Sequence, residues 1–181
     1  MEEMSTAQQK LKILLLLSES WNDISAPNNN VTNWFSNFSN VEIWTISGSG
    51  SLPNNSCCKD YFLISEREML KSLLTFKKVG KAYHYENFPA EKGVGAEVVS
   101  KTPLFKETKR LFRDIVWRFG KYDQKKLGEF ISAFQPDIIF SQRKGSIKMC
   151  RMERLVSKLA NVPMVAYTGD DEFSLRQFSL V

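Results

Sequence analysis

The 181-residue sequence contains a single histidine, His84, and only three cysteines. Protein metal sites are built largely from histidines and from cysteines in paired spacing, so this scarcity argues against a metal centre. Cys57 and Cys58 are adjacent, and adjacent cysteines rarely bridge without strain. We therefore expect reduced thiols, no metal and no cofactor. His84 lies in a polar and aromatic stretch before a proline, where an ordinary structural histidine is the expected interpretation.

Several sequence signals are also missing. The chain has no G-x-S-x-G, P-loop or G-x-G-x-x-G motif and no internal repeat. Its compact N-terminal apolar run, Leu11–Leu17, is too short to span a membrane, and no small-residue cleavage site follows it. At 43% hydrophobic residues the chain suits one domain with a sizeable core. We expect a single cytoplasmic domain over residues 1–181.

Strand-like apolar runs alternate with segments of helical periodicity along the chain. The expected strands are 11–18, 41–47, 59–65, 136–142 and 162–168. The expected helices are 28–38, 66–79, 103–120, 124–134 and 146–160, whereas 80–102 reads as mostly irregular. Such alternation predicts an α/β fold with a doubly wound, mainly parallel sheet flanked by helices. In such sheets ligands bind beyond the carboxyl ends of the strands.

Helical spacing also predicts which residues face the core. In the helix at 124–134 these are Leu127, Phe130, Ile131 and Phe134. In the helix at 146–160 they are Ile147, Cys150, Leu155, Val156 and Leu159.

The segments "FQPDIIFSQ" and "LVSKLANVPMVAYTGDD" resemble the N-terminal half of glycosyltransferases with the GT-B fold, especially bacterial polysaccharide enzymes of the family 4-like type. The opening "LKILLLLSES" and the helix pair before "PDII" are also similar. The resemblance implies a Rossmann-like domain that shapes the acceptor site, while a C-terminal domain, absent from this chain, binds most of the nucleotide-sugar donor. Many members carry a Gly-Gly turn after the first strand, which this sequence lacks.

The resemblance implies an enzyme of capsule, exopolysaccharide or lipopolysaccharide synthesis that transfers a hexosyl group to a glycan or lipid-linked acceptor. This domain alone would be inactive. Two alternatives remain open. The chain is a non-catalytic partner of a split glycosyltransferase, or its net charge of +5 marks a nucleic-acid-binding module. Against the latter, the spacing of Phe112, Phe119, Phe130 and Phe134 predicts burial rather than base stacking.

Five residues after the strands are candidates for the site. Asp170 and Asp171 follow the last strand, where one could take a proton from the acceptor as the catalytic residue, although either could instead cap a helix. Arg143 and Lys144 precede a helix start and suit an anionic group such as a diphosphate. Glu19, just after the first strand, is a further substrate-binding candidate.

Residues 101–126 carry nine lysines and arginines but only three acids. In the helix expected there, apolar residues occupy one side. The cations expected to face a membrane gather on the other, at Lys106, Lys109, Arg110 and Arg113. We expect the apolar side to pack on the sheet and the basic side to meet anionic lipid at the inner face of the cell membrane.

Overall fold

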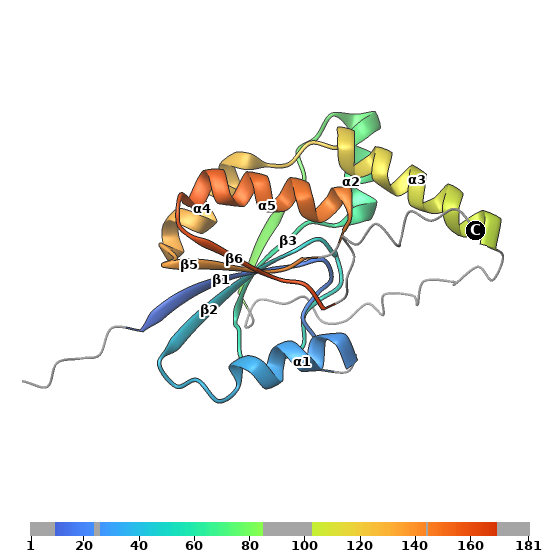
Figure 1. Ribbon diagram of the computed structural model, residues 1–181. Coiled ribbons are helices and arrows are strands. Elements are labelled where there is room, and N and C mark those ends of the chain that lie inside the picture. Colours follow the sequence, from blue (N-terminus) through green and yellow to red (C-terminus); the bar gives the residue numbers. More distant parts are fainter. Residues whose placement is uncertain (1–9, 24–25, 85–102, 144, 170–181) are drawn as a thin grey trace, which may run out of the picture.

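The computed structural model describes residues 10–23, 26–84, 103–143 and 145–169, with the backbone alone at 26–29 and 103–110. Within these ranges a six-stranded sheet is flanked by five helices (Figure 1). The elements in chain order are β1 (Leu11–Leu17), α1 (Ala26–Phe35), β2 (Val41–Ser47), β3 (Asp60–Leu63), α2 (Glu66–Thr75), β4 (Lys81–His84), α3 (Pro103–Phe119), α4 (Gln124–Phe134), β5 (Ile138–Gln142), α5 (Ile147–Ala160) and β6 (Met164–Tyr167).

The strand β1 forms the middle of the sheet. It pairs in parallel with β2 on one side and with β5 on the other. Its residues from Ile13 to Leu17 are buried whichever face they point to, which explains why the run is continuously apolar rather than alternating. The sequence prediction of a fully buried parallel strand is confirmed.

The strand order is β4-β3-β2-β1-β5-β6, and only β4 runs antiparallel to its neighbour. The chain builds the sheet outward from β1 to β3 and then returns to the other side of β1 with β5. The direction of building therefore reverses between β1 and β5, which is where ligands bind in open α/β sheets. The expectation of irregular chain from residue 80 missed β4, a four-residue strand with few β-branched residues.

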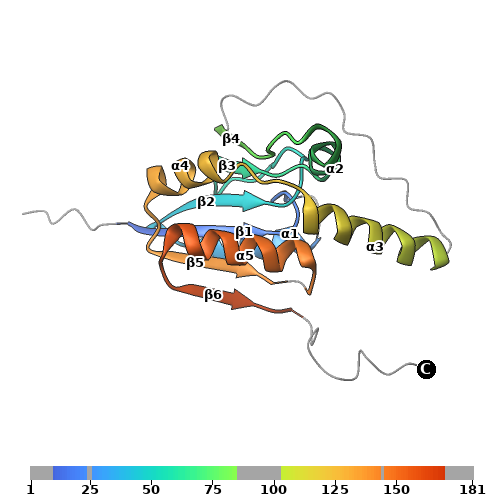
Figure 2. The same ribbon diagram turned by 90° about the horizontal axis from the view of Figure 1, so that it is seen from above.

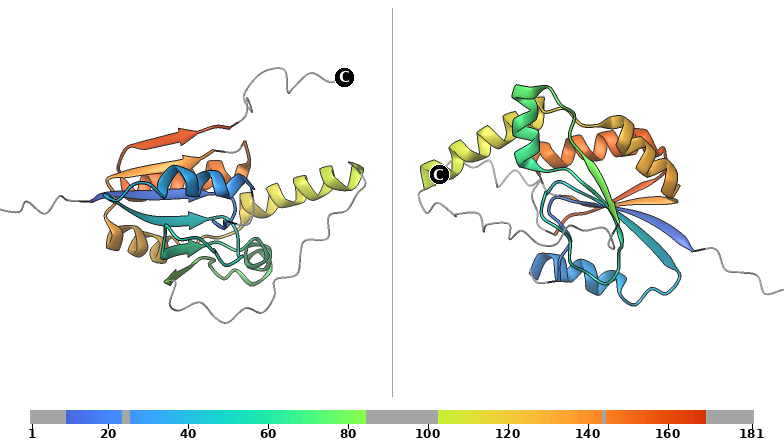
Figure 3. Two further views of the ribbon diagram at one scale, coloured as in Figure 1. Left: turned by 90° about the horizontal axis from the view of Figure 1, so that it is seen from below. Right: turned by 180° about the vertical axis from the view of Figure 1, so that it is seen from behind.

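Helices cover both faces of the sheet. Figures 1 and 3 show α1 on one face and the other helices on the opposite one. On the α1 side Val31 and Phe35 pack against the odd-numbered residues of β1. On the other side Leu14 and Leu16 belong to a larger core to which α2, α3, α4 and α5 contribute. Successive side chains of β1 point to opposite faces of the sheet and therefore belong to two separate cores.

The helix α4 begins after Asp123, whose side chain accepts a hydrogen bond from the Lys126 amide. Its four predicted core residues, Leu127, Phe130, Ile131 and Phe134, are all buried.

The orientation predicted for α5 was right only in part. Val156 is buried and Leu155 packs partly buried against the core, as predicted, but Ile147, Cys150 and Leu159 are exposed. Its buried residues are Met149, Met152, Glu153 and Val156. The helix is turned because Glu153 has partners inside the protein, described below, so a charged residue replaces an apolar one in the buried stripe.

The helix α3 also departs from expectation. Its last turns reach the core through Val116 and Trp117, which are buried. The rest of the helix projects past the carboxyl ends of the strands, as Figure 2 shows from above. The apolar residues Leu111, Phe112, Ile115 and Phe119 are exposed. The prediction that this side packs on the sheet is wrong, because the helix overhangs the sheet edge and little of it has a core to face.

Candidate functional site

The loops after β1 and β2 are joined into one rim at the carboxyl edge of the sheet. The Asn54 amide donates to the Trp21 carbonyl and the Asp23 amide donates to the Asn54 carbonyl, both at 2.9 Å. The Ser20 hydroxyl donates to the Ser51 carbonyl from the other end of the rim. These bonds connect residues 18–23 with 48–54, so the rim has a defined shape although it contains neither helix nor strand.

Trp21 anchors this rim from below. Its ring is fully buried, and its Nε1 donates to Thr32 Oγ1 of α1 at 2.8 Å. The Asn55 amide group donates to the Trp21 carbonyl at 3.3 Å and to the Tyr61 hydroxyl at 2.9 Å. The rim is thus fastened both to α1 and to β3, which makes it a fixed platform rather than a loose loop.

Lys148, in the first turn of α5, links the loops after β1 and β2, close to the point where the strand order reverses. Its Nζ donates to the carbonyl oxygens of Ser18 at 2.6 Å and Gly48 at 3.1 Å, which follow β1 and β2. Gly48 makes this approach possible, since a Cβ there would lie 2.7 Å from Lys148 Cδ. The ammonium group also lies 5.4 Å from the centre of the Trp117 ring of α3. One side chain therefore connects β1, β2, α3 and α5.

Arg143 follows β5 at the same edge and is held by a buried carboxylate. Its Nε and Nη2 lie 3.1 Å and 3.0 Å from Glu153 Oε2. The other carboxylate oxygen of Glu153 accepts a hydrogen bond from the Ser141 hydroxyl at 2.7 Å. The Glu153 side chain is 3% exposed, whereas that of Arg143 is 39% exposed. The buried carboxylate of Glu153 thus orients the Arg143 guanidinium, which solvent or a ligand can still reach.

This arrangement suits an anionic ligand group. Two cationic side chains, Lys148 and Arg143, lie where the strand order reverses, beside the N-terminus of α5. Backbone amides at a helix N-terminus carry a partial positive charge. A fixed, accessible guanidinium matches the geometry of phosphate or carboxylate oxygens.

Two of the five predicted site residues fall within the described ranges. Glu19 is exposed just after β1, and Arg143 follows the adjacent strand β5, so both lie at the carboxyl edge as expected. Lys144, Asp170 and Asp171 lie outside the described residues. The strand β6, which precedes the two aspartates, pairs in parallel with β5 and ends at the same edge.

Of the four predicted membrane-facing residues, Lys106, Lys109 and Arg110 lie in α3 with side chains outside the described part. Arg113 is exposed, as predicted.

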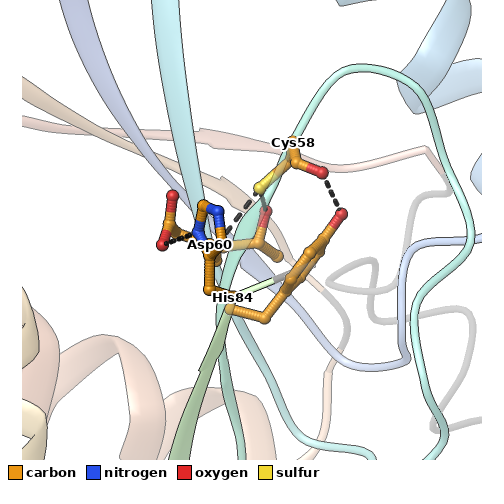
Figure 4. Close-up of polar contacts among 5 residues, drawn as sticks. Cys58, Asp60 and His84 are labelled. Carbon is orange, nitrogen blue, oxygen red and sulfur yellow. Dashed lines mark hydrogen bonds and ion pairs between the residues drawn. The ribbon is translucent and has the colours of Figure 1, made fainter. Parts of the chain in front are cut away.

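His84 lies away from this edge. It ends the antiparallel strand β4 opposite Asp60, the first residue of β3, so both lie at the amino edge of the sheet. Figure 4 shows His84 Nδ1 and Asp60 Oδ1, which are 2.8 Å apart, next to Cys58. Burial raises the pKa of the Cys58 thiol to about 12, so it stays protonated and is no nucleophile at neutral pH. The His84–Asp60 pair links the end of β4 to the start of β3.

No group of three or more metal-ligating side chains is found in the described part of the chain. Among the described helices, none is both long enough and apolar enough to cross a membrane. Comparison of the chain with protein-family models, with curated proteins and with solved structures finds no match. The case for a function therefore rests on the site itself.

Sequence reasoning missed Lys148, Glu153 and Gly48. A lysine and a glutamate within an amphipathic helix normally read as solvent-exposed residues. One signal was available for Glu153, because it falls at i+4 from Met149 and i−3 from Val156, within the stripe that the structure buries.

Proposed function

We propose that the chain is the acceptor-side domain of a sugar-nucleotide-dependent glycosyltransferase of bacterial polysaccharide synthesis. The fold would then be a Rossmann-like domain, the N-terminal half of a GT-B enzyme. The observation that carries the proposal is the carboxyl edge between β1 and β5, where Arg143 is fixed by Glu153 yet remains accessible. That edge is where open α/β sheets bind ligands.

In this proposal Arg143, with Lys144, binds an anionic group such as the diphosphate of a lipid-linked acceptor. Glu19, across the reversal point, accepts hydrogen bonds from sugar hydroxyls. Asp170 or Asp171 takes the proton of the attacking hydroxyl, because β6 leads toward the edge where Arg143 lies. Lys148 holds the rim in place through the carbonyls of Ser18 and Gly48 and is a positioning residue.

The donor nucleotide is expected to bind mainly to a second domain. The sequence lacks a glycine-rich phosphate-binding loop, and the Asp23 and Asn54 amides of the rim already donate to carbonyl groups within it. Residues 1–181 alone should therefore bind nucleotide sugars weakly and transfer no sugar.

The test is binding followed residue by residue. We would titrate the labelled chain with a short-chain prenyl diphosphate sugar, as an acceptor analogue, and with UDP-glucose, and record amide chemical shifts. The proposal predicts shifts at Ser18, Gly48 and Arg143 with the acceptor analogue, and only weak effects with UDP-glucose. Shifts confined to the amino edge, near His84, would overturn the site.

Two arginine variants sharpen this test. Arg143→Lys keeps the charge but loses the forked geometry, and should weaken binding of the acceptor analogue about tenfold. Arg154→Lys is the matched control, because Arg154 is an exposed arginine of α5 and should leave affinity unchanged. Micromolar affinity for UDP-glucose by calorimetry would contradict the assignment to the acceptor side and favour a nucleotide-binding role.

A further inference from the structure

The helix α3 carries an apolar surface that the described part of the chain leaves exposed. We call Leu111, Phe112, Ile115 and Phe119 the α3 stripe; these side chains are 63%, 54%, 52% and 67% exposed. Their spacing of three, four and seven places them on one side of the helix. Single exposed apolar residues are ordinary, but four large ones grouped on one helix face mark an interaction surface.

The stripe points outward because the opposite side of the helix is fastened to the core. Val116 and Trp117 are buried, and Arg151 Nη1 of α5 donates to the Trp117 carbonyl. The helix packs against α2 and α5 at this end, while its other end projects past the sheet (Figure 2). The stripe therefore lies on a projecting helix that is anchored at one end.

Cationic side chains lie beside the stripe and on the opposite side of α3. Arg118, three residues after Ile115, borders the stripe, whereas Arg113 lies on the other side of the helix. Both are exposed, as is Lys121, two residues after the helix ends. Lys121 Nζ lies 4.8 Å from the centre of the Phe76 ring, an exposed aromatic residue at the end of α2 with Lys77 and Lys78 next to it. Farther along α3 the sequence adds Lys106, Lys109 and Arg110. The surroundings of the stripe are thus strongly basic.

We infer that α3 docks the chain on an anionic lipid bilayer by inserting the α3 stripe among the acyl chains, with the surrounding cations at the headgroups. An apolar side opposed to a Lys/Arg-rich side is the pattern of helices that lie in the membrane interface. Each cation near an anionic leaflet adds attraction that salt weakens. This corrects the expected mode of contact, since the apolar side meets lipid directly.

The bilayer fits better than other occupants. A nucleic acid would need several adjacent aromatic faces for base stacking, whereas the aliphatic side chains of Leu111 and Ile115 separate the two phenylalanines of the stripe. A second copy would bring two basic surfaces together, which repel each other. A flat anionic surface can contact a projecting helix and matches its positive charge.

The docking also orients the carboxyl edge. Trp117 is in contact with Lys148, which bonds the carbonyls of Ser18 and Gly48 at the rim. Because α3 projects past this same edge (Figure 2), the docking helix and the rim lie at one end of the molecule. This inference does not depend on the proposed glycosyltransferase role and stands or falls by its own test.

The test is co-sedimentation of the chain with phosphatidylcholine vesicles prepared with and without phosphatidylglycerol, at low and high salt. We expect binding to the anionic vesicles at low salt and little to the neutral ones. The double variant Phe112→Ser with Ile115→Ser should lower the partition coefficient at least about tenfold, since it removes two inserted apolar side chains. Its control is Phe38→Ser with Val165→Ser, which removes residues of similar exposure, 59% and 48%, on other elements.

A charge pair completes the design. Arg113→Glu with Arg118→Glu should lose about tenfold or more on anionic vesicles, because two attractions become repulsions. Arg154→Glu with Lys158→Glu on the exposed side of α5 changes the net charge equally and should lose much less. Circular dichroism confirms that each variant is folded.

Three results would overturn the inference. They are equal binding to neutral and anionic vesicles, equal losses in the α3 variants and their controls, and absence of vesicle binding. In the last case light scattering and an oligonucleotide titration identify the true occupant. A dimer or a nucleic-acid complex that the Phe112→Ser, Ile115→Ser variant abolishes would assign the stripe to that partner instead.

Discussion

The helices α3 and α4 are consecutive, both are amphipathic, and both lie on the same side of the sheet, yet they treat their apolar residues in opposite ways. Phe130 and Phe134 of α4 are buried, whereas Phe112 and Phe119 of α3 are exposed. The periodicity of a sequence thus identifies an apolar face but does not say whether the protein itself covers that face.

The difference comes from what lies beneath each helix. Under α4 the sheet presents Trp44, whose ring stacks on Phe134 at a centroid distance of 4.8 Å and contacts Phe130 at 4.8 Å. Under most of α3 there is no sheet, because the helix overhangs the carboxyl edge. Position relative to the sheet therefore decides the energetic role of each apolar residue.

The largest effect that would separate the two helices is a cavity under α4. Phe134→Ala should lower the free energy of unfolding by about 3–5 kcal/mol, because it empties a fully buried site against Trp44. Urea denaturation followed by circular dichroism measures it. Phe112→Ala in α3 is the matched control and should change stability by less than about 0.5 kcal/mol. Equal losses would mean that the stripe is packed after all.

The next prediction concerns α5. This helix buries the charged residue Glu153, whereas α3 exposes apolar residues. Glu153→Ala should lower the free energy of unfolding by about 2–3 kcal/mol, since it leaves Ser141 and Arg143 without their carboxylate partner. Glu129→Ala removes an exposed glutamate that pairs with Lys125 at 4.0 Å on α4, and it should cost only a few tenths. Similar costs for the two variants would contradict the structural role of Glu153.

A third prediction uses the buried thiol on the α1 side of the sheet. Burial raises the pKa of Cys58 from 9.0 to about 12, so the folded protein keeps a proton that the unfolded chain loses above pH 9. The contribution of this protonated thiol to the free energy of unfolding is largest below pH 9. It falls as the pH rises, with a slope that approaches about 1.4 kcal/mol per pH unit between the unfolded and folded pKa values.

Between pH 9 and pH 10 the Cys58 thiol is the more deeply buried of two contributing thiols, because burial also raises the pKa of Cys57, and Tyr61 and Tyr122, whose pKa values burial raises from 10.0, add a smaller part. Denaturant unfolding at both pH values measures the slope. Cys58→Ala should flatten it, and Cys150→Ala, at an exposed cysteine, should not. An unchanged slope in Cys58→Ala would assign the effect to another group.

The smallest effect is the most informative about α3. Ile115→Ser with Phe119→Ser should change the free energy of unfolding by less than about 0.5 kcal/mol, because both side chains are already exposed to water. Ile131→Ser in α4 provides the contrast, since it places a hydroxyl in the core. A loss of several kcal/mol in the α3 variant would show that the stripe stabilises the fold.

Much of the fold could be predicted from the sequence. The run from Ile13 to Leu17 identified a strand buried on both faces, and the spacing of Phe130 and Phe134 identified the inner side of α4. These predictions succeeded because burial and periodicity agree there. The strand β4 was missed because an edge strand of four residues needs little apolar sequence.

The candidate site was predictable only in part. Arg143 could be placed because it follows a strand directly, and every parallel strand delivers its next residues to one edge. Lys148 and Glu153 could not, because their roles depend on partners far away in sequence. Lys148 bonds a carbonyl 130 positions earlier, and no local pattern records such a contact.

The central position of β1 has a consequence for how the chain assembles during synthesis. The strand Leu11–Leu17 is made before both of its neighbours, and β2 is the first of them to follow. Its other edge stays unpaired until β5 is made. The hydrogen bond from the Lys12 amide to Asp137 Oδ2 on that side spans 125 positions of sequence. Such distant pairing is slow to form, and an unpaired apolar edge invites contacts with other chains. The nascent chain thus carries this apolar strand with only one paired edge until residues 138–142 have left the ribosome.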